Sequence, residues 1–305
     1  LTHLAGYLEA EVTDETGRVT STAWRHVYFP NWDWPVYTQI NWESLNTDGV
    51  AGLVGRRMVE EWGWDCNLGE MGPYSAHWNA RGLAHGSLLR MGAYPNGAFR
   101  DALSCAVTGW NGTRWGEIKK VIGDDEHPWR PIVREMCDRE YARRVSESKA
   151  YGHTAYNLGD ECGFSTAAGY GPSDREFFPK FLEMKYGTIE NYNAIRGTNY
   201  TSFAQVPHLK LKEARDTDNT QAWFDQIQYA ERIYAEAMRM HRDSILKIEP
   251  KARVGAEGSV PGDLEETVRG LKFWGPYKSK IQNEVLREIA EPDVLRGIWW
   301  GGYVN

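Results

Sequence analysis

The chain has 305 residues, which suffices for one large domain, or for one domain with an appendage. Its 42 Asp and Glu residues outnumber its 35 Lys and Arg residues, and the net charge of −7 disfavours nucleic acid, which needs clustered basic side chains. No apolar run approaches the roughly 20 residues of a membrane-spanning helix, so we expect neither a nucleic acid nor a membrane as a partner.

The first segment alternates in the manner of β-strands. Two alternating runs, Tyr7–Val12 and Arg18–Trp24, flank the sequence Thr-Asp-Glu-Thr-Gly, which is a strong turn signal. We expect a β-hairpin segment over residues 1–34 that forms the end of an upstream β-domain. The Pro- and Trp-rich stretch Pro30–Pro35 marks its boundary with a second domain over residues 35–305.

From residue 35 onward, short apolar strands alternate with helical segments, which is the pattern of parallel α/β folds. The predicted strands are Val36–Ile40, Cys66–Gly69, Leu88–Tyr94, Thr154–Gly159, Arg253–Ala256, Leu271–Trp274 and Leu295–Trp300. The predicted helices between them include Val50–Trp62, Pro131–Ser148 and Gln221–Ile248. This succession predicts a (β/α)8 TIM barrel. A closed barrel needs an eighth strand, so we expect the last strand–helix unit to be missing at the C-terminal end.

The fourth predicted strand, Thr154–Gly159, leads directly into two carboxylates, Asp160 and Glu161. In a barrel of this kind the carboxyl ends of the strands form the floor of the active site. A Glu that is partly desolvated there, beside a second negative charge, keeps its proton more readily. This property suits a general acid that protonates a glycosidic oxygen. An acidic pair that caps the next helix is the alternative interpretation.

The chain is rich in aromatic residues, with 14 Trp and 16 Tyr. Flat rings with a polar edge suit the faces of sugar rings. Two aromatic pairs lie at the ends of predicted strands, namely Trp274 with Tyr277 and Trp299 with Trp300. We expect these four side chains to bind substrate by stacking and by contacts to hydroxyl groups. Packing between loops is the alternative.

A segment beyond the acidic pair has a more specific pattern. Phe178–Asn193 reads FPKFLEMKYGTIENYN, and TNYTSF follows at Thr198–Phe203. Trp223–Phe224 lies near the start of the long predicted helix, and Glu249–Pro250 leads into the fifth strand. Over roughly Pro131–Ser259, under half of the chain, these features resemble the β-galactosidases of glycoside hydrolase family 42, within the (β/α)8-barrel clan A. In that family an Asn-Glu pair ends strand four, and a similar helix and aromatic segment follow.

The resemblance implies that Glu161 is the catalytic acid/base, because of its place in the pair. Asp160 stands where the clan has the Asn that holds the 2-hydroxyl of the sugar. Asp accepts that hydrogen bond but cannot donate one, and its charge favours the protonated form of Glu161 further. The implied activity is a retaining, β-galactosidase-like hydrolysis, with room for another β-linked sugar.

The nucleophile of the clan is a Glu at the end of strand seven, but the predicted strand Leu295–Trp300 carries no carboxylate. Three explanations stay open. The nucleophile lies beyond Asn305, or it is Glu257 at the end of strand five or Glu70 at the end of strand two, or the barrel binds sugar without cleaving it. Glu257 and Glu70 are equally candidates for hydrogen bonds to the substrate.

The sequence predicts no metal site and no cofactor. The four cysteines lack a CxxC spacing, and His77, His85 and His153 are dispersed and lack a carboxylate at ligand spacing. No glycine pattern that cradles phosphate is present in the sequence. The leading hypothesis is therefore a glycosidase with a carbohydrate substrate. A non-catalytic carbohydrate-binding barrel and a polysaccharide lyase are the rivals, and a homo-oligomer is compatible with the family resemblance.

Overall fold

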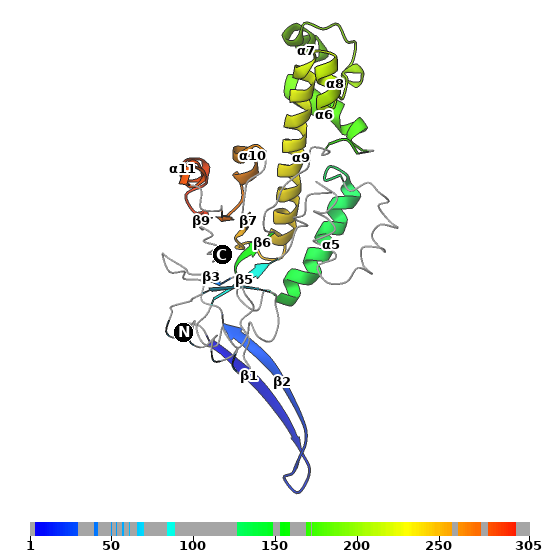
Figure 1. Ribbon diagram of the computed structural model, residues 1–305. Coiled ribbons are helices and arrows are strands. Elements are labelled where there is room, and N and C mark those ends of the chain that lie inside the picture. Colours follow the sequence, from blue (N-terminus) through cyan, green and yellow to red (C-terminus); the bar gives the residue numbers. More distant parts are fainter. Residues whose placement is uncertain are drawn as a thin grey trace.

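A parallel sheet of seven strands lies at the centre of the computed structural model (Figure 1). The structure describes residues 4–29, 40–41, 66–69, 84–88, 127–148, 153–158, 169–171, 173–257, 262–275 and 280–296, together with residues 50, 53, 57 and 61. The strands of the sheet are β3 (Ile40–Asn41), β4 (Cys66–Gly69), β5 (Ala84–Leu88), β6 (His153–Asn157), β7 (Val254–Glu257), β8 (Phe273–Gly275) and β9 (Leu295–Arg296). They pair in sequence order from β3 to β9, and every pair is parallel. Because parallel neighbours need a crossover connection, this is the order of repeated strand–helix units.

The sheet confirms the predicted succession of seven strands. Of the predicted first strand Val36–Ile40, only Ile40 is described, and it begins β3. The third strand spans Ala84–Leu88, whereas the sequence predicted Leu88–Tyr94. The prediction followed the apolar run that begins at Leu88, but the paired residues are the weakly apolar Ala-His-Gly-Ser before it. Residues 89–94 lie outside the described part of the chain. Closure of the sheet by an eighth strand, and the division of the chain at residue 34, stay predictions.

The predicted hairpin is confirmed. Strands β1 (Leu4–Thr13) and β2 (Val19–Phe29) pair antiparallel as a two-stranded sheet that extends away from the parallel sheet (Figure 1). The Asp14 carboxylate closes the turn, because its Oδ1 accepts the backbone N–H of Thr16 at 2.9 Å and that of Arg18 at 3.0 Å. Gly17 supplies the left-handed residue of the turn, with φ at 81°.

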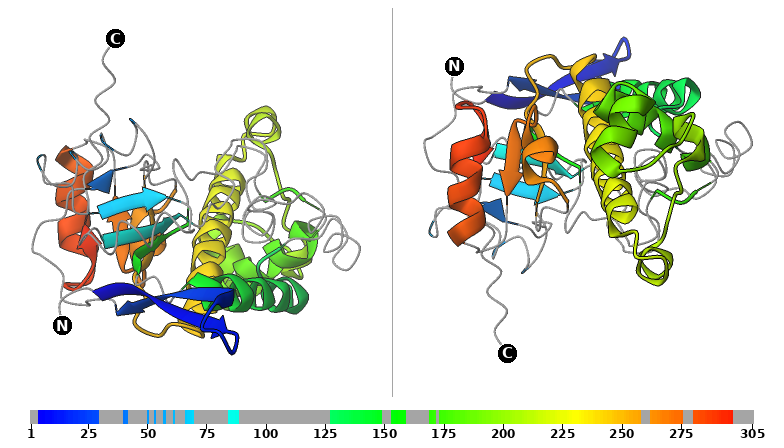
Figure 2. Two further views of the ribbon diagram at one scale, coloured as in Figure 1. Left: turned by 90° about the horizontal axis from the view of Figure 1, so that it is seen from below. Right: turned by 90° about the horizontal axis from the view of Figure 1, so that it is seen from above.

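Helices flank the sheet, with α11 on one side of the strands and α9 on the other (Figure 2). The helices are α5 (Pro131–Ser148), α6 (Asp174–Tyr186), α7 (Ile189–Arg196), the 3-10 turn η2 (Phe203–Gln205), α8 (Leu211–Asp216), α9 (Thr220–Leu246), α10 (Leu264–Val268) and α11 (Lys280–Ile289). The predicted helix at Pro131–Ser148 is confirmed at both ends, and α9 agrees with the predicted Gln221–Ile248 within two residues. Most of the predicted helix Val50–Trp62 lies outside the described residues. No helix in the described part of the chain is both long and apolar enough to cross a bilayer.

Helix α9 belongs to two hydrophobic cores. Its C-terminal half packs with the sheet and with α5 in the inner core, to which Tyr234, Met238 and Ile245 contribute. Its N-terminal half packs with α6 and α7 in the outer core, which consists of Phe177, Phe178, Phe181, Leu182, Tyr186, Tyr192, Val206, Tyr229 and Ile233. At 27 residues, α9 is about 40 Å long, which is enough to reach both. Helices α6, α7 and α8 accordingly surround the end of α9 that lies away from the sheet (Figure 1).

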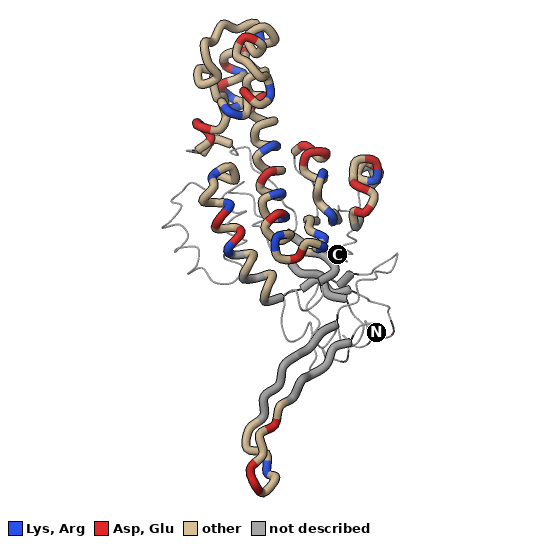
Figure 3. Tube along the Cα trace, turned by 180° about the vertical axis from the view of Figure 1, so that it is seen from behind, with Lys and Arg blue, Asp and Glu red and all other residues tan. Residues whose placement is uncertain are grey.

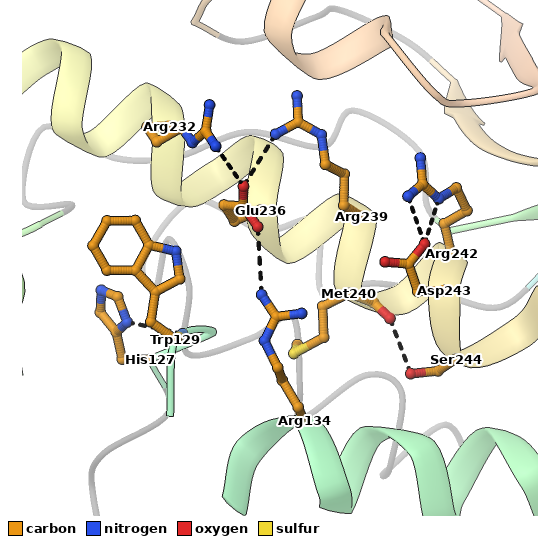
Figure 4. A network of polar contacts seen from close by, with 10 residues as sticks. All are labelled: His127, Trp129, Arg134, Arg232, Glu236, Arg239, Met240, Arg242, Asp243 and Ser244. Atoms are coloured by element: carbon orange, nitrogen blue, oxygen red, sulfur yellow. Dashed lines mark hydrogen bonds and ion pairs between the residues drawn. The ribbon is translucent and has the colours of Figure 1, made fainter. Parts of the chain in front are cut away.

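Charged residues of both signs alternate along α5 and α9 (Figure 3). At their contact, Glu236 of α9 forms ion pairs with Arg134 of α5 at 3.4 Å, Arg232 at 3.0 Å and Arg239 at 3.2 Å (Figure 4). Arg239 also donates to the carbonyl oxygen of Glu266 in α10 at 2.6 Å. This polar cluster joins three helices at the rim of the inner core.

Gly255 allows β7 and β8 to approach closely, because a Cβ atom at this position would lie 1.6 Å from the carbonyl oxygen of Phe273. We predict that Gly255→Ala lowers the free energy of unfolding by about 3 kcal/mol, the upper end of the usual cost of overpacking. As a control, Gly197→Ala meets no atom within 4 Å, and its left-handed conformation, with φ at 66° and ψ at 36°, should cost only about 1 kcal/mol. Urea denaturation of both variants measures the difference, and equal losses would contradict the prediction.

Candidate active site

The candidate carboxylates follow the carboxyl ends of strands in the same sheet. In the sequence, Glu70 comes directly after β4 and Glu161 follows β6, whereas Glu257 is the last residue of β7. Because all seven strands are parallel, their carboxyl ends lie along one edge of the sheet. The structure therefore brings to one edge the strand ends that lead into these three residues.

Strands β6 and β7 are direct neighbours in this sheet. Asn157 of β6 pairs with Gly255 of β7, and Glu257 follows two residues later. The carboxyl end of β7 thus lies beside the point where the chain leaves β6 toward Glu161. Glu161 and Glu257 are 96 positions apart in the sequence, yet one follows β6 and the other ends β7, and these two strands are adjacent.

Most of the other predicted site residues lie outside the described part of the chain. They are Glu70, Asp160, Glu161, Tyr277, Trp299 and Trp300. Their roles, and that of Glu257, stay predictions. Among the residues that the structure does describe, no group of three or more His, Cys, Asp or Glu side chains is arranged to hold a metal ion.

Trp274 is the one predicted sugar contact whose side chain the structure describes. It lies on β8, its side chain is 0% exposed, and it belongs to the inner core between the sheet and the helices. Burial of this extent favours packing, the alternative that the sequence left open. A contact between Trp274 and a substrate stays a prediction.

A buried hydrogen-bond network lies at the downstream end of the segment that carries Glu161. Asp174, the first residue of α6, accepts a hydrogen bond from the hydroxyl of Tyr229 on α9 at 2.6 Å. The same hydroxyl lies 2.9 Å from Nε2 of His127, just before α5. The second oxygen of Asp174 accepts the backbone N–H of Gly171 at 2.6 Å. Asp174, Tyr229 and His127, here called the Asp174 network, are all buried.

The hydrogen bonds of the Asp174 network have a defined direction. The backbone N–H of Trp129 donates to Nδ1 of His127 at 3.1 Å (Figure 4), so a neutral ring carries its proton on Nε2 and donates it to Tyr229. Burial, together with the charge of Asp174, raises the pKa of the Tyr229 hydroxyl, which keeps its proton and donates it in turn. Burial opposes the charge of Asp174, but the contacts with His127 and Tyr229 outweigh it and hold the pKa of Asp174 below its usual value.

Sequence reasoning missed this network. Tyr229 is 55 residues from Asp174 and 102 residues from His127 along the chain, so no local pattern joins them. The only usable signal is at Asp174, because acidic residues are typical of the first turn of a helix. That signal predicts a helix start and says nothing of the partners.

A second buried carboxylate, Asp225, lies in α9 beside the outer core. Its Oδ1 is 2.7 Å from Nζ of Lys185, 2.8 Å from Nη2 of Arg196 and 2.7 Å from the hydroxyl of Tyr186. The side chain of Asp225 is 0% exposed, and a buried charge of this kind needs such partners. This cluster fastens α6 and α7 to α9, and we assign it a structural role.

The lowered pKa of Asp174 gives a prediction for the pH dependence of stability. A carboxylate whose pKa is depressed by folding stabilises the protein above its unfolded pKa of about 3.9, and this contribution is lost as the pH falls through the folded value. Asp174→Asn should therefore lower the free energy of unfolding by about 2 kcal/mol at pH 7, and by less at pH 3. Urea denaturation at both pH values is the measurement.

The matched control is Asp216→Asn, which removes an exposed carboxylate that is paired with Lys212 at 2.8 Å. Exposed ion pairs contribute little, so this variant should be nearly as stable as the unmodified protein at both pH values. A loss for Asp174→Asn that is the same at pH 7 and pH 3 would show that the charge of Asp174 is not the cause.

No family model matches the chain. A curated β-galactosidase from Thermus thermophilus is 34% identical over a region that covers 34% of this chain and 19% of the relative. The solved structure of a β-galactosidase from Bacillus circulans sp. alkalophilus covers 80% of this chain and 40% of its own, with a TM-score of 0.54 and 12% identity. An agarase structure covers 94% of this chain and 40% of its own, with a TM-score of 0.48 and 14% identity.

The sequence match confirms the predicted resemblance to glycoside hydrolases. The Bacillus circulans structure is that of a glycoside hydrolase with a TIM-barrel-like fold, and this chain is similar to it in fold. The match with the curated relative spans about a fifth of that protein, and the solved structure is matched over 40% of its length. This chain is thus similar to parts of β-galactosidases in sequence and in fold.

Proposed function

We propose that this chain forms most of the catalytic barrel of a glycosidase that cleaves a β-linked sugar, with Glu161 as the proton donor. The observation that carries the proposal is the strand order, in which β6 leads toward Asp160 and Glu161 and its neighbour β7 ends in Glu257. The sequence likeness to a curated β-galactosidase supports the same reaction class. A closed (β/α)8 barrel is part of the proposal, since the parallel strand order is the one that such barrels have.

The proposed reaction needs two carboxyl groups on opposite sides of the glycosidic bond. Glu161 protonates the leaving oxygen, while a carboxylate attacks the anomeric carbon and forms a glycosyl-enzyme that water then hydrolyses with retention of configuration. Glu257 is the nucleophile that we favour within the chain, and Glu70 is the alternative. Both come from strand ends on the same edge of the sheet as β6, the arrangement that paired carboxylates need.

The proposed substrate is a β-galactoside, because the curated relative is a β-galactosidase. Asp160 would accept a hydrogen bond from a sugar hydroxyl. Tyr277, Trp299 and Trp300 follow the ends of β8 and β9 in the sequence, and aromatic rings at that edge suit the apolar face of a sugar.

The test is hydrolysis of aryl β-galactosides by the full protein that carries this chain and by its Glu161→Gln variant. Glu161 would also take the proton of the water that hydrolyses the glycosyl-enzyme, so the readout is kcat/KM, which reports the first step alone. Loss of a general acid should lower kcat/KM about 10²- to 10⁴-fold for phenyl β-galactoside, whose leaving group needs a proton. The loss should be much smaller for 2,4-dinitrophenyl β-galactoside, whose leaving group departs as an anion. Glu265→Gln on the exposed side of α10 is the control and should change neither rate.

Other outcomes would replace the proposal. Sugar binding that survives Glu161→Gln, with no turnover of any aryl glycoside by the unmodified protein, would favour a non-catalytic carbohydrate-binding barrel. Products with ultraviolet absorption from a new double bond would favour a lyase in which Glu161 acts as a base. Equal losses for the two galactosides would assign Glu161 a role other than proton donation.

A further inference from the structure

We propose that the Asp174 network positions the segment that carries Glu161, so that Tyr229 and His127 are positioning residues for acid catalysis. This proposal rests on the proposed function of Glu161. The segment runs from the end of β6 to the start of α6, and a general acid is effective only when it is held within hydrogen-bond reach of the leaving oxygen. The structure describes the residues at its two ends, up to Leu158 on one side and from Gly169 on the other.

The upstream end of the segment is fixed by the sheet. The backbone N–H of Tyr156 donates to the carbonyl of Arg253, and that of Leu158 donates to the carbonyl of Gly255, each at 2.7 Å. Tyr156 and Leu158 are both 0% exposed, so the chain is also packed at this point. The segment therefore departs from a rigid strand.

The downstream end is fixed by side chains and not by a sheet. The Asp174 carboxylate holds the backbone of Gly171 at 2.6 Å, and the Tyr170 hydroxyl donates to the carbonyl of Leu209 at 2.6 Å. Gly169 adopts φ +80°, and a Cβ on it would lie 3.2 Å from the ring of Tyr229. Gly169 thus lies close to the ring of Tyr229, whose hydroxyl also donates to Asp174 at the start of α6.

The Asp174 network links this end to the connection that precedes α5, beside the contacts that Arg130 makes with Ser173 at 3.4 Å and with Glu176 at 2.7 Å. His127 lies in that connection, and its Nε2 is 3.5 Å from Oδ1 of Asp174 and 2.9 Å from the Tyr229 hydroxyl. Its ring also stacks on Phe177 of α6, with centroids 4.2 Å apart. Tyr229 therefore ties the ends of two successive strand–helix connections, those that follow β5 and β6, to the rigid helix α9.

The chain offers a matched control for Tyr229. The Tyr186 hydroxyl donates to the buried carboxylate of Asp225 at 2.7 Å, much as the Tyr229 hydroxyl donates to Asp174 at 2.6 Å. Both tyrosines belong to the outer core. Tyr186 joins α6 to α9 and has no contact with residues 169–171 among the described interactions. A Tyr→Phe change at either position removes one hydroxyl-to-carboxylate hydrogen bond from the same core.

The experiment compares Tyr229→Phe with Tyr186→Phe in the full protein, using phenyl and 2,4-dinitrophenyl β-galactoside. We expect Tyr229→Phe to lower kcat/KM about tenfold for the phenyl substrate, part of the ~10²- to 10⁴-fold that a general acid supplies, and less than about twofold for the dinitrophenyl substrate. Tyr186→Phe should lower both rates equally or not at all. His127→Gln, which keeps Tyr229, should repeat the selective loss if Tyr229→Phe folds poorly.

Amide hydrogen exchange of peptides that cover residues 159–172 gives a readout without turnover. Exchange should be about tenfold faster there in Tyr229→Phe, and unchanged in Tyr186→Phe. If neither variant changes exchange in these peptides, or if Tyr229→Phe slows both substrates alike, the positioning role is overturned. If the unmodified protein turns over neither galactoside, the proposed function fails, and faster exchange in Tyr229→Phe would show that the anchor exists without an acid to position.

Discussion

Helix α9 can bury its apolar side chains only if its two halves pack in two different hydrophobic cores. The arrangement of the other helices depends on this constraint. Ile233 belongs to the outer core and the next residue, Tyr234, to the inner core, so the change of partner occurs within one step of the helix. Toward the sheet, α9 packs with α5 and β7. Away from the sheet, the helix would expose Tyr229 and Ile233 to water if α6 and α7 did not cover them.

The same constraint explains the positions of two buried carboxylates. Asp225 and Asp174 are both in the outer part of the molecule, and each is held by donors from another helix or from a connection between elements. Apolar packing fixes the distance between two helices but leaves their rotation adjustable, whereas directional hydrogen bonds fix both. The outer helices are therefore locked onto α9 in one orientation.

Features that depend on neighbouring residues in the sequence could be predicted, and features that depend on contacts between residues far apart in the chain could not. The bounds of α5 and the turn at Asp14 agree because short patterns determine them. By its spacing, Phe224 continues the run of apolar residues at three- and four-residue steps in α9, yet it is 52% exposed, because Ala222 and Asp225 take the buried side there. The Asp174 network depends on residues far apart in the chain. The acidic candidates Glu161 and Glu257 came from strand ends, and the neighbouring positions of β6 and β7 agree with that reasoning.

The helices from α6 to α8 are inserted between β6 and α9, and the strand order does not depend on them. Both ends of this insertion meet at the N-terminal half of α9, through Asp174 at one end and Asn219, which caps α9, at the other. Because the two ends of this insertion lie close together, it can gain, lose or exchange residues during evolution while the sheet stays the same. Related chains that keep the seven strands are thus free to differ in what they build beside the strand that leads to Glu161.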